Sequence, residues 1–433
     1  MQSVTRPNIA LNSDLYVAVV RRLLFLAFLL VMLPAPAAGH ASPSIQFGVQ
    51  DDAWLQYGPG TLTERLDRLN TLGVDIVRVT IDWRQTEPTR GVDNWARADL
   101  LLNGLHEHGI AALVTLYGTP GWANGGKAEN WAPTSTTTFA AFARRIAVRY
   151  PFVHRWAIWN EPNQRRWLRP TSPLVYTQRL LNPAVAAIHK ASPGSLVAGG
   201  VTAPRASTGG VSPIDWIAGM QAAHAKLDAY AHNPYPLQPG ETPTSGGCDH
   251  CSTITMATLP RLLNAVQLAF GTKTRIWLTE YGYQTNPPDT LLGVSYAKQA
   301  EYDSEAALRA YLAPRVDMLI HYLVRDEPDP ARWQSGLLTV GALAKPSYQA
   351  FQLPLTQQSR SGTRTVLWGQ VRPGGSSSYR LQQLRNGNWY SVGGNETTSA
   401  RGYYTRVVRA VAGARFRIWS PAVHTYSRIV TVT

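Results

Sequence analysis

Short apolar runs alternate with amphipathic segments along most of this chain, and this alternation constrains the fold more than any other feature. Eight apolar runs of strand length occur within roughly three hundred residues, and the segments between them carry apolar residues at helical spacing. Eight such units predict a (β/α)₈ TIM barrel, an α/β fold with a closed inner ring of parallel strands and an outer ring of helices. A doubly wound open sheet is the alternative, but it rarely contains eight units, and no glycine-rich phosphate-binding fingerprint follows the first run.

The carboxyl ends of the eight runs are where a barrel of this kind places its functional side chains. The runs lie at residues 45–50, 75–83, 110–117, 156–159, 196–200, 227–236, 275–280 and 317–324. Chemically useful residues end or follow several of these runs, and we expect them to meet at one mouth of the barrel. They are Asp51, Arg78, Asp82, Trp122, Glu161, His232, Tyr235, Glu280 and Asp326.

The hydrophobic period changes near the C-terminus, which indicates a second domain. We expect the barrel to occupy residues 42–355 and a polar linker to occupy residues 356–364. Beyond the linker, apolar residues alternate with polar ones, and Asn386-Gly387 matches a two-residue hairpin turn. Residues 365–433 are therefore predicted to form a small β-sandwich. For this domain, a structural or spacer role is favoured over sugar binding.

Residues 1–41 have the pattern of a secretory leader. Arg21 and Arg22 precede an apolar run at 23–33, and small residues up to Ala41 then offer cleavage sites. The run is too short to be a good transmembrane span, although an uncleaved anchor is the alternative. We therefore expect a secreted, extracellular protein with no membrane span after the leader is removed.

The chain is strongly basic. Its formal net charge of +14 would fall to +12 without the leader, which contains three arginines and one aspartate. Such a charge favours association with acidic envelope polymers. It could also indicate nucleic-acid binding, but the sequence contains no basic helix, no zinc-finger spacing and no basic–aromatic strand motif. We therefore expect no nucleic-acid partner and interpret the charge as a surface adaptation.

The two cysteines, Cys248 and Cys251, lie close together with His250 between them. Outside the cell, a disulfide across this short loop is the favoured state. A redox motif would be expected at a helix start in a cytosolic protein, and a zinc site would need a second pair of ligands, which the sequence lacks. We expect a Cys248–Cys251 disulfide and neither a metal nor an organic cofactor.

The fourth run ends abruptly in Asn160, Glu161 and Pro162. Proline cannot donate to a strand ladder, so the strand should stop here and leave Glu161 at its end, beside an amide and next to aromatic residues. Partial desolvation in such a place raises the pKa of a carboxyl toward the range that suits a general acid. Capping of the strand, or pairing with an arginine, is the structural alternative.

The seventh run ends in the same way, at Glu280. Hydrolysis of a glycosidic bond needs one carboxylic acid that protonates the leaving oxygen and one carboxylate on the other side of the anomeric carbon. Glu161 and Glu280 fit this pair, with Glu280 as a nucleophile that Arg78 and Tyr235 could hold ionised. A glutamate also follows an apolar run at Glu327, so the pattern alone yields three candidates.

Together, these motifs make the chain resemble the clan A retaining glycoside hydrolases, and within that clan the cellulase-like family 5 and the β-xylosidase-like family 39. The resemblance covers about residues 45–351. It implies that Glu161 is the acid/base and that Glu280 is the nucleophile. The residues that carry it are Asn160-Glu161-Pro162 on the fourth run, Thr279-Glu280-Tyr281-Gly282 on the seventh, Arg78 on the second, His232 with Tyr235 on the sixth, and the barrel close at 336–351.

The resemblance also implies a sugar-binding site around the two glutamates. Many clan members carry a tryptophan on the eighth strand, whereas Tyr322 is the aromatic residue of this run. The polar residues at 325–327 are interpreted as substrate contacts or as an ion network at the rim. The expected substrate-binding residues are Asn160, Arg78, His232, Tyr235, Trp122, Tyr281, Asp82 and Tyr322, while Trp54, Trp83 and Tyr117 could line the site or belong to the core.

We therefore expect a secreted retaining glycoside hydrolase that cleaves β-type O-glycosidic bonds of an oligo- or polysaccharide by double displacement. Two alternatives stay open. One is a non-catalytic carbohydrate-binding or envelope-associated protein on a barrel scaffold, and the other is a transglycosylase that uses the same carboxylates. The sugar, the linkage and endo or exo action depend on loops such as 125–133 and 238–254, whose shapes the sequence does not determine.

Overall fold

The structure is a computed structural model that describes residues 42–248 and 252–433. The predicted leader and Cys251 lie outside these residues, so secretion and the Cys248–Cys251 disulfide stay predictions. In the described ranges, no helix combines the length and the apolar character that crossing a bilayer requires.

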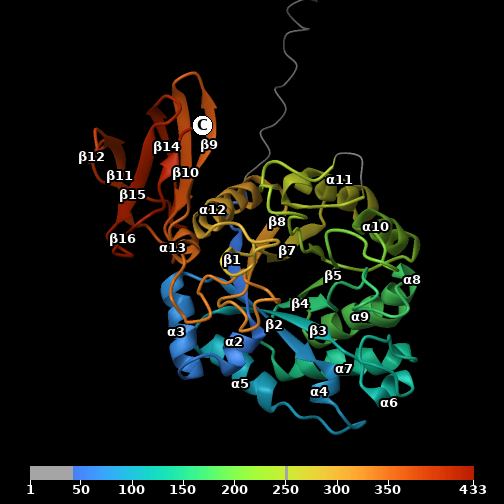
Figure 1. The fold of residues 1–433 in the computed structure, drawn as a ribbon. Helices are drawn as coiled ribbons and strands as arrows, with labels where there is room; N and C mark the ends of the chain where they lie inside the picture. Colours follow the sequence, from blue (N-terminus) through green and yellow to red (C-terminus); the bar gives the residue numbers. More distant parts are fainter. Residues whose placement is uncertain (1–41, 249–251) are drawn as a thin grey trace, which may run out of the picture. The chain divides into compact units, whose positions relative to one another are not determined.

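Eight parallel strands form a closed barrel, in which each strand pairs with the next one along the chain and β8 pairs with β1 (Figure 1). The predicted (β/α)₈ fold is thus confirmed, and the doubly wound alternative is wrong. Parallel pairing of consecutive strands requires a crossover connection, which helices supply. The strands are β1 (Gln46–Gln50), β2 (Ile76–Asp82), β3 (Ala111–Tyr117), β4 (Arg155–Ile158), β5 (Leu196–Thr202), β6 (Ala229–His232), β7 (Arg275–Tyr281) and β8 (Val316–Tyr322).

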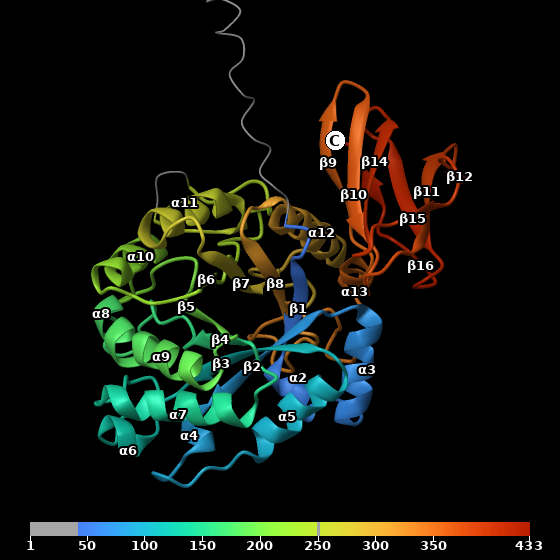
Figure 2. The same ribbon diagram turned by 180° about the vertical axis from the view of Figure 1, so that it is seen from behind.

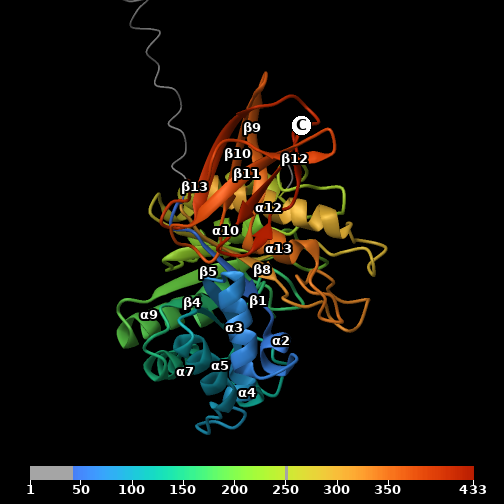
Figure 3. The same cartoon turned by 90° about the vertical axis from the view of Figure 1, so that its left-hand side faces the viewer.

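Helices cover the outer face of the barrel, as Figure 2 shows for α7 and α9 and Figure 3 shows for α3 and α5. Thr61 and Glu64 form a capping box at the start of α3, and Gly73, with a φ of 78°, ends that helix. A π-helical turn comes just before Pro183, which has no N–H to continue regular helix bonding. The helices are α2 (Asp52–Tyr57), α3 (Leu62–Leu72), α4 (Trp83–Thr86), α5 (Ala96–Glu107), α6 (Gly121–Asn124), α7 (Thr136–Arg149), α8 (Pro173–Tyr176), η1 (Thr177–Leu181), α9 (Asn182–Ala191), α10 (Pro213–Ala222), η2 (Met256–Thr258), α11 (Leu259–Phe270), α12 (Tyr296–Leu312) and α13 (Pro346–Gln352).

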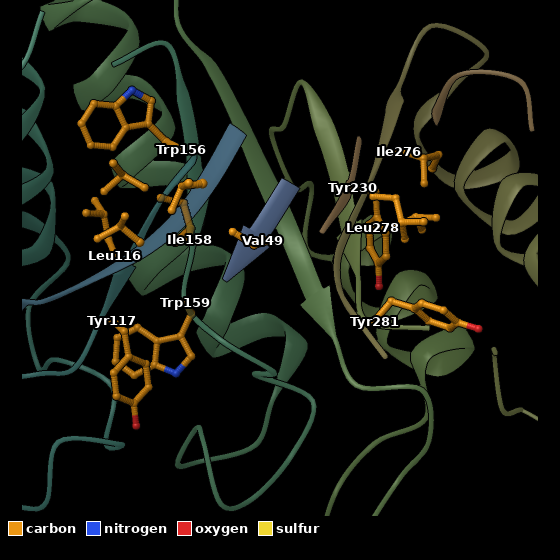
Figure 4. Close-up of a cluster of buried hydrophobic side chains, with 14 of the residues drawn as sticks. Val49, Leu116, Tyr117, Trp156, Ile158, Trp159, Tyr230, Ile276, Leu278 and Tyr281 are labelled. Carbon is orange, nitrogen blue, oxygen red and sulfur yellow. The ribbon is translucent and has the colours of Figure 1, made fainter. Parts of the chain in front are cut away.

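The barrel sheet buries apolar side chains on both faces, because neighbouring side chains of a strand point to opposite sides. The inner cluster combines small residues such as Ala157 and Ala231 with the larger Trp277 and Met318. The larger outer cluster lies between sheet and helices, and Figure 4 shows Ile158, Tyr230 and Leu278 among its members. The same alternation decides which strand-end residues can face the mouth of the barrel.

Two antiparallel sheets follow the barrel and share a core of their own, as predicted. Tyr379 of one sheet stacks on Tyr404 of the other, with ring centroids 4.5 Å apart. Asn386 and Gly387 turn β11 into β12 with φ values of 46° and 80°. The strands are β9 (Leu355–Ser361), β10 (Arg364–Gln370), β11 (Ser378–Arg385), β12 (Asn388–Ser391), β13 (Glu396–Thr397), β14 (Tyr403–Arg409), β15 (Arg415–Ser420), β16 (Thr425–Tyr426) and β17 (Val430–Thr431).

The linker predicted at residues 356–364 is wrong. Most of this segment belongs to β9, which pairs antiparallel with β10 at the edge of the first sheet. An edge strand tolerates polar and charged side chains because one of its edges meets solvent, so this polar sequence can form a strand. Gly362, with a φ of 57°, then turns the chain into β10. The chain therefore passes from α13 into the sandwich with almost no spacer.

Candidate active site

A pocket of about 1110 Å³ lies among the carboxyl ends of the barrel strands and the loops that follow them. Both Glu161, just after β4, and Glu280, near the end of β7, line it. Arg78 is fully buried behind them. Tertiary structure thus brings together the two glutamates that the sequence analysis paired. The other predicted site residues that line the pocket are Asn160, Asp82, Tyr235 and Tyr322.

The backbone that carries Glu161 is strained. β4 ends at Ile158, and Trp159 and Glu161 then have positive φ values of 74° and 38°. Residues other than glycine rarely adopt this left-handed conformation, which costs on the order of 1–3 kcal/mol and persists only where surrounding contacts impose it. The N–H of Trp159 donates to the carbonyl of Leu116 at 2.8 Å, and that of Glu161 donates to the carbonyl of Val201 at 2.9 Å. The turn ends the strand and directs Glu161 to the pocket.

The surroundings of Glu161 favour its protonated form. Burial is the largest cause and the negative charge of Glu280 is the second, and together they raise the pKa of Glu161 from its ordinary 4.5 to about 7. Hydrogen bonding opposes this shift. Nδ2 of Asn233 donates to Oε1 of Glu161 at 3.0 Å, and the side chain of Trp167 also lowers the pKa of this carboxyl. Glu161 can therefore both carry and release a proton near neutral pH.

Glu280 is held by two donors. Nη1 of Arg78 contacts its Oε1 at 2.5 Å, and the hydroxyl of Tyr235 donates to its Oε2 at 3.1 Å. Glu280 is 8% exposed and Arg78 is 0% exposed, so little water screens this ion pair. Burial and the charge of Glu280 raise the pKa of Tyr235 well above 10, so the phenol keeps its proton and stays a donor. The two donors fix the position and orientation of the Glu280 carboxyl group in the pocket.

Arg78 connects the surroundings of the two glutamates through one planar group. Its Nε donates to Oγ1 of Thr115 at 2.9 Å, and its Nη1 donates to Oε1 of Gln50 at 2.8 Å. Its Nη2 donates to Oδ1 of Asn160 at 2.9 Å. The guanidinium is rigid, so these contacts fix its orientation toward Glu280. The amide nitrogen of Asn160 has no acceptor among the described residues and can donate to a bound sugar.

Asn233 is a site residue that the sequence analysis missed. Besides donating to Glu161, it accepts a hydrogen bond through Oδ1 from the hydroxyl of Thr279 at 2.8 Å. This second contact fixes which end of the amide faces Glu161. The signal was present in the sequence, because Asn233 lies in the sixth run between the predicted site residues His232 and Tyr235.

Three aromatic side chains form one wall of the pocket, and one of them was also missed. They are Tyr235, Tyr322 and Trp333. The Trp333 ring centroid lies 4.9 Å from that of Tyr235 and 5.4 Å from that of Tyr322. Trp333 is 36% exposed, so it offers an indole surface on which a sugar ring can stack. It lies in the loop after β8 rather than on the strand, where the sequence analysis sought an aromatic residue.

The fold has counterparts among solved structures. A family 39 glycoside hydrolase from Bacteroides cellulosilyticus WH2 matches 88% of this chain and 82% of its own, with a TM-score of 0.59 and 16% identity. The match with the GH39 enzyme from Xanthomonas axonopodis pv. citri covers 86% of this chain and 93% of that enzyme, with a TM-score of 0.55 and 15% identity. The match with GH5_18 from Streptomyces cattleya covers 71% of this chain and 79% of that protein, with a TM-score of 0.53 and 18% identity. The fold is that of family 39 and family 5 glycoside hydrolases.

Comparison of sequences alone shows a weaker similarity than comparison of structures does. A curated protein of Oryza sativa subsp. japonica that carries the name beta-glucosidase 17 is 33% identical over 141 residues, which is 29% of this chain. The match spans 42% of that relative, so the chain corresponds to less than half of it. No family model matches the chain. The expected resemblance is therefore confirmed by the tertiary structure.

Within the glycoside-hydrolase fold, His232 does not reach the pocket, and its predicted substrate-binding role is wrong. Its side chain is fully buried, with Nδ1 2.8 Å from the Thr202 hydroxyl and Nε2 3.1 Å from the Ile254 carbonyl. Burial lowers the pKa of His232 to about 4, so the imidazole is neutral at physiological pH. Ala231 belongs to the inner cluster, and alternation along β6 turns His232 to the outside of the barrel.

Trp122 and Tyr281 also lie outside the pocket, so their predicted sugar contacts are wrong. The indole N–H of Trp122 donates to the carbonyl of Glu87 at 2.9 Å, and its ring packs edge-on against Trp83 at 5.5 Å. Tyr281 is 2% exposed, packs edge-on against Tyr283 and belongs to the outer cluster of Figure 4. The register of β7 shifts between Leu278 and Tyr281, so Glu280 lines the pocket while Leu278 and Tyr281 both belong to the outer cluster.

Some of the remaining candidate residues line the pocket, and others are buried outside it. Asp82 lines the pocket and also caps α4, because its Oδ1 accepts from the N–H of Arg84 at 2.8 Å. Asp326 is buried and pairs with Nζ of Lys345 at 2.7 Å, whereas Glu327 lines the pocket and comes within 4.0 Å of Arg332. Trp54, Trp83 and Tyr117 were expected either to line the site or to belong to the core. Tyr117 lines the pocket, whereas Trp54 and Trp83 are buried and do not line it.

The site supplies acid and carboxylate chemistry. One carboxyl group carries a proton near neutral pH, and the other is paired with a buried arginine. These are the two states that glycosyl transfer requires of its carboxyl groups. Across residues 42–248 and 252–433, no group of three or more His, Cys, Asp or Glu side chains is arranged to hold a metal ion.

Proposed function

We propose that this protein is a retaining glycoside hydrolase that cleaves β-type O-glycosidic bonds of an oligo- or polysaccharide. One observation carries the proposal. Two glutamates line one pocket in different surroundings, with Glu161 favouring its protonated form and Glu280 paired with the buried guanidinium of Arg78. Double displacement needs a proton donor and a nucleophile of this kind. The similarity to glycoside hydrolases in fold supports the proposal.

In the first step, an oxygen of Glu280 attacks the anomeric carbon and forms a glycosyl ester while the bond to the leaving oxygen breaks. The proton of Glu161 moves to that oxygen, so the leaving group departs as a neutral alcohol. In the second step, Glu161 takes a proton from water, and the water oxygen attacks the anomeric carbon. Glu280 departs as a carboxylate. Each step inverts the anomeric carbon, so the product retains the original configuration.

The electrostatics of the pair explain how Glu161 can serve first as acid and then as base. The charge of Glu280 contributes to the raised pKa of Glu161 in the resting protein. Formation of the glycosyl ester removes that charge, so the pKa of Glu161 falls during the intermediate. Glu161 then stays ionised until it takes the proton of the attacking water.

Other pocket residues have supporting roles in this proposal. The free amide nitrogen of Asn160 donates to a sugar hydroxyl, and Asn233 orients the Glu161 carboxyl. Trp333 and Tyr322 supply the stacking surface for a sugar ring. We also propose that the protein acts outside the cell and meets acidic envelope polymers, on the basis of its leader pattern and its net charge of +12 without the leader. The N-terminus of protein recovered from culture medium would test secretion.

A panel of aryl glycosides and polysaccharides tests the proposed reaction. We expect at least one β-linked substrate to be hydrolysed, and we expect proton NMR of the earliest product to show the β anomer before mutarotation. The α anomer as first product would contradict retention. Binding of an oligosaccharide without turnover during long incubation would favour the non-catalytic alternative. Addition of an acceptor sugar to the same assay separates hydrolysis from transglycosylation, because a transglycosylase would yield mainly transfer products.

The pH dependence of kcat/KM should reflect the loss of the catalytic proton from Glu161 as the pH rises. Because the pKa of Glu161 is about 7, the protonated fraction is about half at that pH and falls about tenfold for each further pH unit. We expect kcat/KM for a substrate with a poor leaving group to fall in the same way. A dinitrophenyl glycoside is the control, because its leaving group needs little protonation and its alkaline limb should be flatter. A fall that begins below about pH 5 would contradict the raised pKa.

A further inference from the structure

Most charged side chains of the pocket have an opposite charge nearby. Besides Glu161, which favours its protonated form, two groups differ from the rest. Arg166 and Arg205 line the pocket and are exposed, and no carboxylate in the described part of the chain lies within ion-pairing distance of either. The pocket therefore contains two guanidinium groups whose charge is unmatched. The matched pairs are Asp52 with Arg97, Asp82 with Arg84, Glu327 with Arg332 and Glu280 with Arg78.

Arg205 lies on a loop whose backbone is held in place. Gln164, which is 6% exposed, donates to the carbonyl of Arg205 and accepts from the N–H of Ser207 at 3.0 Å. Asn163 is fully buried and accepts from the N–H of Ala203 at 2.9 Å. The loops that follow β4 and β5 are thus joined into one wall by buried amides. This wall presents Arg205 from a fixed position, so little ordering of the backbone is needed when a ligand binds.

Arg166 lies on the same wall, close to the proton donor. Its guanidinium carbon is 5.5 Å from the ring centroid of Trp167, a cation–π distance. Trp167 lines the pocket, and its side chain faces Glu161 closely enough to lower the pKa of that carboxyl. Arg166 also opposes the burial that raises the pKa of the pocket residue Tyr117. The charge of Arg166 therefore acts within the pocket, beside the Trp167 indole and near Tyr117.

Glu161 marks the leaving-group side of the pocket, because a proton donor must contact the oxygen of the bond that breaks. The wall that carries Arg166 and Arg205 is therefore the one that the departing sugar meets. We propose that these two arginines bind a negatively charged sugar residue, a uronic acid unit, directly on the leaving-group side of the scissile bond. This inference rests on the proposed glycosidase function, which assigns the proton donor.

The chemistry of the two groups supports a carboxylate ligand. A guanidinium presents parallel N–H donors that match the two oxygens of a carboxylate, and it binds this group better than a neutral hydroxyl. One exposed arginine contributes only a few-fold in affinity, whereas two that act on the same carboxylate contribute roughly tenfold or more. A neutral sugar would leave both charges in the pocket wall without a partner.

Binding of matched charged and neutral oligosaccharides tests the inference. The probes are short oligomers of galacturonate, of glucuronate and of mannuronate, each paired with the same oligomer after chemical reduction of its carboxyl groups. Tryptophan fluorescence or calorimetry on the wild-type protein gives Kd for each pair. We expect at least one charged oligomer to bind about tenfold or more tightly than its reduced form. Arg166→Gln and Arg205→Gln should each lower this preference about three- to fivefold, and the double variant should remove it.

Arg144→Gln is the matched control, since Arg144 is an exposed arginine of α7 outside the pocket and its loss should leave the preference intact. Equal binding of charged and reduced oligomers, absence of binding of all three charged oligomers, or a preference that survives the double variant would overturn the inference. The test is separable from the proposed reaction. Hydrolysis without a preference for charged oligomers would support the glycosidase function and reject the uronate site. Charge-selective binding without hydrolysis would support the uronate site and reject the glycosidase function.

Discussion

Replacing Glu280 with glutamine is expected to lower kcat/KM by at least about 10⁴-fold on any substrate that the wild-type protein hydrolyses. Glutamine has the same shape but is too weak a nucleophile to form the glycosyl ester, so the reaction loses its first step. Steady-state kinetics on the best substrate of the panel would measure the loss. Mass spectrometry would add direct evidence, because a 2-fluoro glycoside should label the wild-type peptide that contains Glu280 and leave the variant unlabelled.

Two controls separate loss of the nucleophile from loss of the fold. Glu327→Gln changes the third glutamate that the sequence pattern proposed, and this residue lines the same pocket. We expect this variant to keep kcat/KM within about tenfold of wild type. Arg78 loses its charged partner in Glu280→Gln and stays buried, so some loss of stability is expected, and circular dichroism at the assay temperature must show a folded protein. A folded Glu280→Gln variant with wild-type activity would refute the nucleophile assignment.

Replacing Glu161 with glutamine is expected to produce a loss that depends on the leaving group. For substrates whose leaving group needs a proton, kcat/KM should fall by about 10²- to 10⁴-fold, the usual contribution of general acid catalysis. For a dinitrophenyl glycoside, formation of the ester should proceed at a rate closer to wild type, and hydrolysis of the ester should become limiting. Azide should then restore turnover and yield a β-glycosyl azide, because this anion attacks without a general base. An equal loss for both kinds of substrate, with no effect of azide, would contradict the acid/base role.

The same substitution should stabilise the fold at alkaline pH. The pKa of Glu161 is raised in the folded protein from 4.5 to about 7, so the folded state holds a proton that the unfolded state has released between these values. The contribution of this carboxyl to stability is therefore present in full below about pH 4.5 and is lost as pH rises through 7. Glutamine does not ionise, so Glu161→Gln should gain about 1–3 kcal/mol relative to wild type between pH 5 and pH 8. Urea unfolding at the two pH values would measure this difference.

For some residues, a position at a strand end did not determine whether the side chain faces the pocket. His232 and Tyr281 stand at strand ends as expected, yet both face away from the pocket. His232 does so because side chains alternate along β6, and Tyr281 does so because β7 shifts its register after Leu278. Strict alternation from Leu278 would have turned Glu280 outward and Tyr281 inward, so periodicity alone could not place Tyr281. Trp122 belongs to a short helix after β3 and packs against Trp83, a contact that no periodicity indicates.

Residues that the analysis missed lie where the sequence carries weak signals. Asn233 follows directly after a strand and could have been proposed from its position. Trp333 belongs to a long loop, and its approach to Tyr235 depends on how that loop folds back over the barrel mouth. Arg166 and Arg205 stand out only in the tertiary structure, where most charged side chains of the pocket have partners and neither arginine has a carboxylate partner among the described residues.

The sequence by itself determined the barrel and its two glutamates. Strand and helix periods repeat eight times, and proline or glycine follows closely after Glu161 and Glu280, so local chemistry specifies where each strand ends. Tertiary structure decided the rest of the site: that Arg78 pairs with Glu280, that Asn233 contacts Glu161, and which loops supply aromatic and basic walls. These are contacts between segments far apart in the chain, and their geometry depends on closure of the whole barrel, which no local pattern encodes.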